Sequence, residues 1–236
     1  MLHTTRAIVL RTFKHGDRTT VLKAYTEAFG ARSYMVRIAS KSGSRNAALQ
    51  PLGRLELVVT ETSERDMHAV RELRVEHPYT RLHIDHARGA LALFAQEVCY
   101  RTLREETADP ALFSFIQAAL EAMDTGDDIA HFPLILLTQL TKHLGFFPEL
   151  PSIGEDRFDL REGCFFSGTV HHEHCMEPAL SKAFASLLTV DFAHGSASIP
   201  STTRRELLDQ LLVYFRLHVD GFGELRSPEM LHQVLR

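Results

Sequence analysis

The first third of the chain is divided into short alternating runs, and this pattern most restricts what the chain can fold into. The runs are rich in Val, Ile, Thr and Tyr and cover residues 5–13, 19–26, 32–39, 55–61 and 70–76. In the fourth run Leu55, Leu57 and Val59 are apolar at every second position, which predicts a strand with one buried face. Five short strands in so few residues predict a small barrel, and the five-stranded OB-fold is the common oligonucleotide-binding barrel of this size.

From about residue 81 the spacing of apolar residues changes from two to 3.6. Leu91, Phe94 and Val98 fall on one helical stripe, and residues 203–206 have the Thr-x-x-Glu spacing of a capping box, which predicts a helix start there. The predicted architecture is an α+β, multidomain chain with an OB-fold barrel in residues 1–80 and an all-helical domain in 81–236, interrupted by a short extended insertion at about 150–177.

The net charge of −4 over 236 residues is unevenly distributed. Residues 1–54 hold ten basic and two acidic side chains, a net charge of +8, and the remainder carries −12. Such asymmetry predicts that the basic segment contacts a polyanion; the alternative is that a basic domain docks on its acidic neighbour.

The candidate nucleic-acid-binding residues are cations of this basic segment and two tyrosines on which bases could stack. They are Arg6, Arg11, Lys14, Arg18, Lys23, Tyr25, Arg32, Tyr34, Arg37, Lys41 and Arg45. Lys41 and Arg45 belong to a small, polar stretch at 40–46, which predicts a mobile loop that wraps a phosphate backbone. A solvated hairpin loop is the alternative.

Other classes of protein are disfavoured by the sequence. The longest apolar run, 132–137, has six residues, whereas about 18 are needed to span a bilayer. No signal peptide is visible, and three widely spaced cysteines favour a reducing cytoplasm. There is no Gly-rich phosphate loop and no catalytic motif such as His-Glu-x-x-His, so the motifs nominate no catalytic nucleophile.

Five possible metal ligands lie within twelve positions: Cys164, His171, His172, His174 and Cys175. Structural zinc sites usually use two close pairs of ligands, and here Cys164 stands alone. We therefore expect loop histidines and a packed cysteine without a metal. The alternative is a metal-dependent enzyme built on this cluster.

Six motifs follow one another along the chain. They are Thr-Arg-Ala-Ile-Val-Leu-Arg-Thr at 5–12, His-Gly-Asp at 15–17, Tyr-Thr-Glu at 25–27 with Gly30, Leu-Gln-Pro at 49–51, His-Leu-Gly-Phe-Phe-Pro-Glu-Leu at 143–150 and Phe-Asp-Leu-x-x-Gly at 158–163. In this order and spacing, the sequence resembles the RecO family of bacterial DNA repair proteins along essentially its whole length.

The resemblance implies an OB-fold joined to a helical domain, and a recombination mediator that catalyses no chemical step. Family members bind single- and double-stranded DNA, anneal complementary strands, associate with RecR and help load RecA onto DNA coated by single-strand-binding protein. Many members carry a four-cysteine zinc module, but only Cys164 and Cys175 lie in this region here. The insertion is therefore expected to be degenerate and zinc-module-like, with no cofactor, and the protein is expected in the cytoplasm with the nucleoid.

The resemblance also implies contact with the acidic C-terminal tail of single-strand-binding protein. Such a tail needs an apolar groove with cations at its rim. The candidate rim residues are Arg101, Arg104, Lys142, Arg204 and Arg205, with solvated helix faces as the alternative. For the chain as a whole, the alternative is a different OB-fold module such as an RNA binder.

Overall fold

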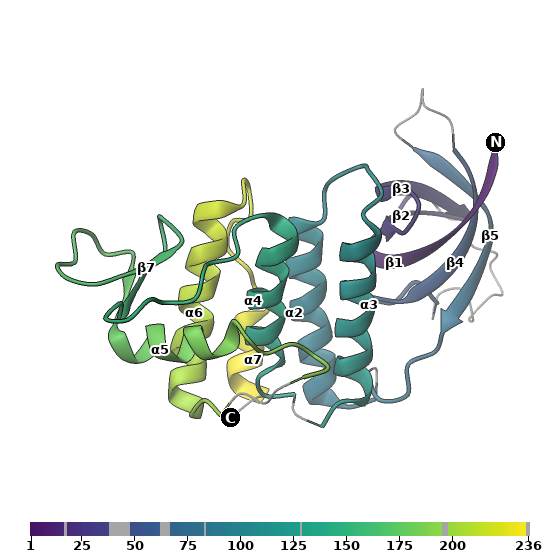
Figure 1. Ribbon diagram of the computed structural model, residues 1–236. Helices are drawn as coiled ribbons and strands as arrows, with labels where there is room; N and C mark the ends of the chain where they lie inside the picture. The colour runs from purple at the N-terminus through teal and green to yellow at the C-terminus, as the bar shows by residue number, and fades with distance from the viewer. Residues whose placement is uncertain are drawn as a thin grey trace. The chain divides into compact units, whose positions relative to one another are not determined.

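The computed structural model describes residues 1–16, 18–37, 48–61, 67–82, 84–127, 129–194 and 198–234 (Figure 1). It consists of two compact units, Met1–Thr125 and Gly126–Arg236, which we describe separately. Within the described residues, none of the helices combines the length and the apolar character that crossing a membrane requires.

The first unit is built on five strands that close into a barrel. They are β1 Leu2–Lys14, β2 Thr19–Thr26, β3 Gly30–Arg37, β4 Arg54–Thr60 and β5 His68–His77. Their order is β1-β2-β3-β5-β4, and β1 also pairs with β4. Only the β3–β5 pair is parallel. The predicted OB-fold is confirmed, and each strand overlaps its predicted range.

Every second side chain along the strands points into the barrel and fills its interior. Leu55, Leu57 and Val59 are fully buried, as their spacing predicts, and Leu22 and Tyr34 join the same core from neighbouring strands. Because successive side chains of a strand point to opposite faces, the intervening positions lie on the outer surface of the barrel. The outer surface is therefore where cationic side chains of the strands can meet a ligand.

Two helices complete the first unit, α2 His86–Thr102 and α3 Pro110–Thr125. Asp85 caps α2 by accepting two backbone N–H groups of its first turn. Gln96 of α2 donates a hydrogen bond to the Leu10 carbonyl of β1 at 2.6 Å. The predicted change from strands to helices near residue 80 therefore falls inside this compact unit.

Gly30 allows the connection between α2 and α3 to lie directly on the barrel. Its φ of +67° is left-handed, and a Cβ at this position would overlap the carbonyl oxygens of Glu105 and Thr107. Ala31 donates its N–H to the Glu105 carbonyl at 2.8 Å. The Thr26 hydroxyl donates to the Gly30 carbonyl at 2.9 Å. The Tyr-Thr-Glu motif with Gly30 thus fixes the connection between α2 and α3 on the barrel.

The second unit combines helices with a small sheet. The helices are α4 Phe132–Leu144, α5 Pro178–Leu187, α6 Ser201–His218 and α7 Pro228–Val234. The sheet, in the order β7-β6-β8, consists of β6 Arg157–Asp159, β7 Cys164–Phe166 and β8 Cys175–Met176, and it is the predicted insertion. Its Phe158 packs against Phe184 of α5 and Tyr214 of α6.

The start of α6 corrects one expectation from the sequence. The helix begins at Ser201, before the Thr-x-x-Glu segment at 203–206, with Pro200 in an extended conformation as its N-cap. Proline fixes the backbone just outside the first turn, so the helix starts there and the capping-box spacing falls inside it.

Candidate nucleic-acid interface

The outer surface of β1, β2 and β3 places exposed cations beside exposed apolar side chains. The strand register sets Arg11 opposite Lys23, and Phe13 in one row with Val21 and Met35. Phe13 is 37% and Met35 41% exposed. We call the exposed, outward-pointing side chains of these strands the strand face: Arg11, Phe13, Lys23, Met35 and Arg37.

Arg11 contacts two aromatic rings. Its guanidinium carbon lies 4.9 Å from the centre of the Phe13 ring and 5.2 Å from that of Tyr100 on α2. Aromatic faces attract a guanidinium and orient its plane while leaving its donors open to solvent. Sequence reasoning missed Tyr100, because no spacing rule shows that this turn of α2 lies next to β1.

The turn between β1 and β2 extends this cationic surface. Lys14 and Arg18 are exposed on either side of Gly16, whose φ is +76°, and the His15 N–H donates to the Thr19 carbonyl at 2.9 Å. In OB-folds this first hairpin loop is one of the usual contacts with oligonucleotides. Lys14 and Arg18 can therefore bind the same strand as the strand face.

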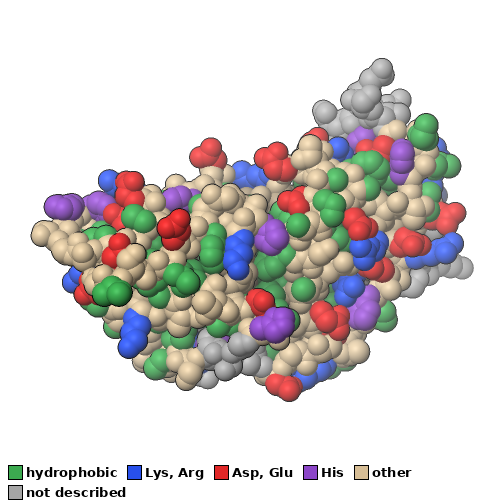
Figure 2. Space-filling model, in the orientation of Figure 1, with side chains coloured by type: hydrophobic (Ala, Val, Ile, Leu, Met, Phe, Trp, Pro, Cys, Tyr) green, Lys and Arg blue, Asp and Glu red, His purple; other side chains and the backbone are tan. Residues whose placement is uncertain are grey.

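A cation is available to bind a phosphate only where no carboxylate already neutralises its charge. On the face drawn in Figure 2, basic and acidic side chains are intermixed. Among the described residues, no carboxylate forms an ion pair with the following four predicted DNA-binding cations: Arg11, Lys14, Arg18 and Lys23. Their charges are available to a polyanion.

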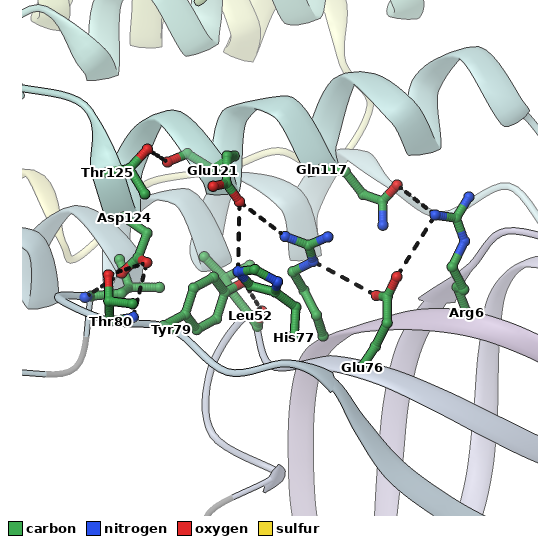
Figure 3. A network of polar contacts seen from close by, with 12 residues as sticks. Arg6, Leu52, Glu76, His77, Tyr79, Thr80, Gln117, Glu121, Asp124 and Thr125 are labelled. Carbon is green, nitrogen blue, oxygen red and sulfur yellow. Dashed lines mark hydrogen bonds and ion pairs between the residues drawn. The ribbon is translucent and has the colours of Figure 1, made fainter.

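Arg6 is neutralised within the barrel unit, which corrects its predicted role. Its guanidinium donates two hydrogen bonds to Glu27. It donates a third to Gln117 and lies 3.7 Å from Glu76 (Figure 3). The hydrogen bonds from Arg6 lower the pKa of the Glu27 carboxyl. Arg6 also covers the Phe113 ring, 5.4 Å from its centre. It therefore joins α3 to the barrel and does not present a free charge.

Arg32 is paired as well, with Glu61 at 3.7 Å and Glu106 at 3.2 Å.

The two tyrosines predicted to stack on bases, Tyr25 and Tyr34, are buried, and neither offers a ring face to a base. Tyr25 is 2% and Tyr34 0% exposed. Tyr25 lies against Phe113 of α3, whereas the Tyr34 hydroxyl donates to Glu61 at 3.0 Å. The predicted stacking of bases on these two tyrosines is therefore wrong, and Phe13 is the exposed aromatic ring of the strand face. Lys41, Arg45 and the loop at 40–46 lie outside the described residues.

The predicted tail-binding cations do not form one rim. Arg101 and Arg104 line a groove of the first unit, treated below. In the second unit His131, at the start of α4, contacts Ile199, just before α6, while Phe146 beyond α4 contacts Tyr214 near the end of α6. The two helices therefore run in the same direction, and Lys142 lies at the opposite end of this pair from Arg204 and Arg205.

Part of the Cys/His cluster comes together on the small sheet. The donor atoms of Asp159, His172 and Cys175 lie within 4.8 Å of one another, and Cys164 pairs with Asp159 from the other neighbouring strand. His172 Nε2 is 3.1 Å from the Asp159 carboxylate. Burial, and then the Asp159 charge, raise the pKa of both thiols, which opposes the thiolate form that binds metals.

The absence of a metal requirement stays a prediction. Three donors are one fewer than a closed structural zinc site uses. We expect substoichiometric zinc by elemental analysis of the purified chain and the same melting temperature with and without EDTA. One zinc per chain that is lost in the Cys175→Ser variant would contradict this expectation.

An OB-fold barrel with a cationic strand face, followed by a helical region, defines the structural class of this protein. Comparison with known proteins gives the family. "Recombination protein O N terminal" matches residues 1–79 and "Recombination protein O C terminal" matches residues 84–228. The chain belongs to the RecO family, as the resemblance in its motifs predicts.

Similar proteins include three that are named DNA repair protein RecO. Those of Flavobacterium psychrophilum and Christiangramia forsetii are 30% and 31% identical, over 98% and 99% of both chains. That of Porphyromonas gingivalis is 28% identical over 98% of both chains. This membership assigns the protein to DNA repair and recombination.

Proposed function

We propose that the protein is a recombination mediator that binds single-stranded DNA on the strand face and catalyses no chemical step. The observation that carries the proposal is the row of Arg11 and Lys23 beside the exposed Phe13, because single-strand binders combine phosphate-neutralising cations with rings on which bases stack. The DNA-bound protein would be found in the cytoplasm with the nucleoid.

Annealing of complementary strands follows from the same surface. Two strands repel each other through their phosphates, and a protein that neutralises several phosphates of one strand lowers that repulsion. Cations bind the backbone and leave the base edges free to pair. Binding of double-stranded DNA follows from the same phosphate contacts.

The salt dependence of binding tests this proposal. If the four cations without described ion pairs, Arg11, Lys14, Arg18 and Lys23, each contact one phosphate, the log-log slope on single strands is about −3. The measurement is fluorescence anisotropy of a labelled DNA strand across a salt series, with RNA of the same sequence as competitor. A slope indistinguishable from zero, or a clear preference for RNA, would refute the proposal.

The partners we propose are RecR, RecA indirectly, and the acidic tail of single-strand-binding protein. In the second unit Arg204 and Arg205 are the proposed rim residues for the tail at the start of α6, where Arg204 donates a 2.8 Å hydrogen bond to the Ile199 carbonyl. Lys142 is a separate candidate at the opposite end of the α4–α6 pair. Annealing of complementary strands coated with single-strand-binding protein tests DNA and partner together. Normal annealing of bare strands and loss on coated strands in the Arg204→Ala/Arg205→Ala variant, or in Lys142→Ala, would support a tail site at that end of the helix pair. Unchanged annealing on coated strands in both variants would remove all three residues from the tail site.

A further inference from the structure

A groove of about 440 Å³ lies where β2 and β3 meet the C-terminal end of α2, all within the first unit. Among the described residues four cations line it, Lys23, Arg32, Arg101 and Arg104, and Glu106 is the one carboxylate. Of these cations Arg32 is paired with Glu61 and Glu106. Ala24, Ala31 and Ser33 also line it from the strands, and their small side chains leave room for a ligand.

The groove is continuous with the strand face. Lys23 belongs to both, since it pairs with Arg11 on β1 and lines the groove. Tyr100 also belongs to the groove lining, and its ring holds the Arg11 guanidinium of the strand face. A strand bound on Phe13 and Arg11 can therefore reach the groove through Lys23 and Tyr100, which the two surfaces share.

The lining favours a nucleic-acid backbone over an acidic, hydrophobic peptide. Such a peptide needs apolar surface, but Leu10 and Leu103, the large aliphatic residues of the lining, are each 3% exposed. A phosphate backbone needs cations and space, and both are present. Glu106 is no strong barrier, because its side chain is 78% exposed and its ion pair with Arg32 is easily exchanged for a phosphate.

We propose that this groove holds the phosphate backbone of a single strand as the strand leaves the strand face, so that Arg101 and Arg104 bind DNA and are not part of a tail-binding rim. The proposal rests on the proposed function and extends the DNA path from the barrel onto α2. It also gives Tyr100 a positioning role, because its ring orients Arg11 at the junction of the two surfaces.

The test compares the Arg101→Gln/Arg104→Gln variant with wild type on oligo-dT of about 6 and about 16 nucleotides, the range that one OB-fold covers. The control is Arg161→Gln/Lys182→Gln, which removes two exposed cations of the second unit. Melting temperatures check folding. On the long strand we expect the salt slope of the groove variant to fall by about 1.4, the value for two lost phosphate contacts, with no change on the short strand or in the control.

Three outcomes would contradict the proposed DNA path through the groove. An unchanged slope on the long strand removes the groove from the DNA path, and a simultaneous loss of affinity for an acidic peptide would assign the groove to a protein partner. An equal loss on both strand lengths would place the groove inside the minimal site and not beyond it. A wild-type slope of zero would instead refute the proposed function itself, so the two failures are distinguishable.

Discussion

Replacing Asp124 with Asn is expected to lower the free energy of unfolding of the first unit by about 3 kcal/mol, because buried donors would lose a charged acceptor. The Asp124 carboxylate is fully buried at the end of α3 and accepts four hydrogen bonds. The backbone N–H groups of Thr80, Arg81 and Leu82 donate at 2.7–2.9 Å, and the Thr80 hydroxyl donates at 2.9 Å (Figure 3). It thus fixes the chain that leaves the barrel against α3.

Urea denaturation followed by tyrosine fluorescence measures this effect, since four of the five tyrosines lie in the first unit. The control is Glu121→Gln on the same helix, whose carboxylate is half exposed and pairs with Arg54 at 3.3 Å. Since Glu121 is half exposed and Arg54 keeps Glu76 as a second partner at 3.7 Å, we expect this variant to lose less than about 1 kcal/mol. Equal destabilisation by the two variants would show that Asp124 is no special anchor.

The same residue predicts a pH dependence of stability. Burial alone would raise the pKa of Asp124, but the donors from Thr80, Arg81 and Leu82 outweigh it and lower the pKa to about 2, from 3.8. A lowered pKa in the folded state means that this contribution, about 2 kcal/mol, is complete above about pH 5 and is lost progressively as the pH falls through 3.8 and toward 2. The Asp124→Asn variant is expected to lack this part of the acid-induced loss.

The barrel could be predicted from the sequence because its cause is local. Leu55, Leu57 and Val59 alternate, and alternation alone specifies which side of a strand is buried. Tyr25 shows the limit of that rule. It points outward from β2, as its position relative to Leu22 and Lys23 requires, but α3 covers it with Phe113. No local pattern shows which part of an outer surface a distant helix will cover.

The candidate site was predictable only as a set of charges. Counting cations identifies the basic segment, yet Arg6 is neutralised by Glu27 and Arg32 by Glu61, and these pairs depend on strand register. The groove lined by Lys23 and Arg101 likewise requires the packing of α2 against β2 and β3. Charge asymmetry therefore predicts that a polyanion binds, and the fold decides which cations are available to bind it.

The strand face gives the largest expected effect on DNA binding. Charge reversal in Arg11→Glu/Lys23→Glu removes two of the four cations without described ion pairs and adds repulsion, so we expect affinity for a single strand to fall roughly 100-fold or more and the salt slope to fall from about −3 to about −1.5. The control Arg74→Glu/Lys182→Glu changes the net charge equally at exposed positions outside the strand face.

Phe13→Ala separates stacking from charge on the same surface. Its ring is 37% exposed beside Arg11, and a base stacked on such a ring contributes about 1–3 kcal/mol by alanine substitution. We therefore expect weaker binding with a nearly unchanged salt slope, because no phosphate contact is removed. Anisotropy titrations of both variants decide the matter. If the charge reversal and its control weaken binding equally, the affinity for DNA depends on the net charge of the protein, and the strand face is not the DNA-binding site.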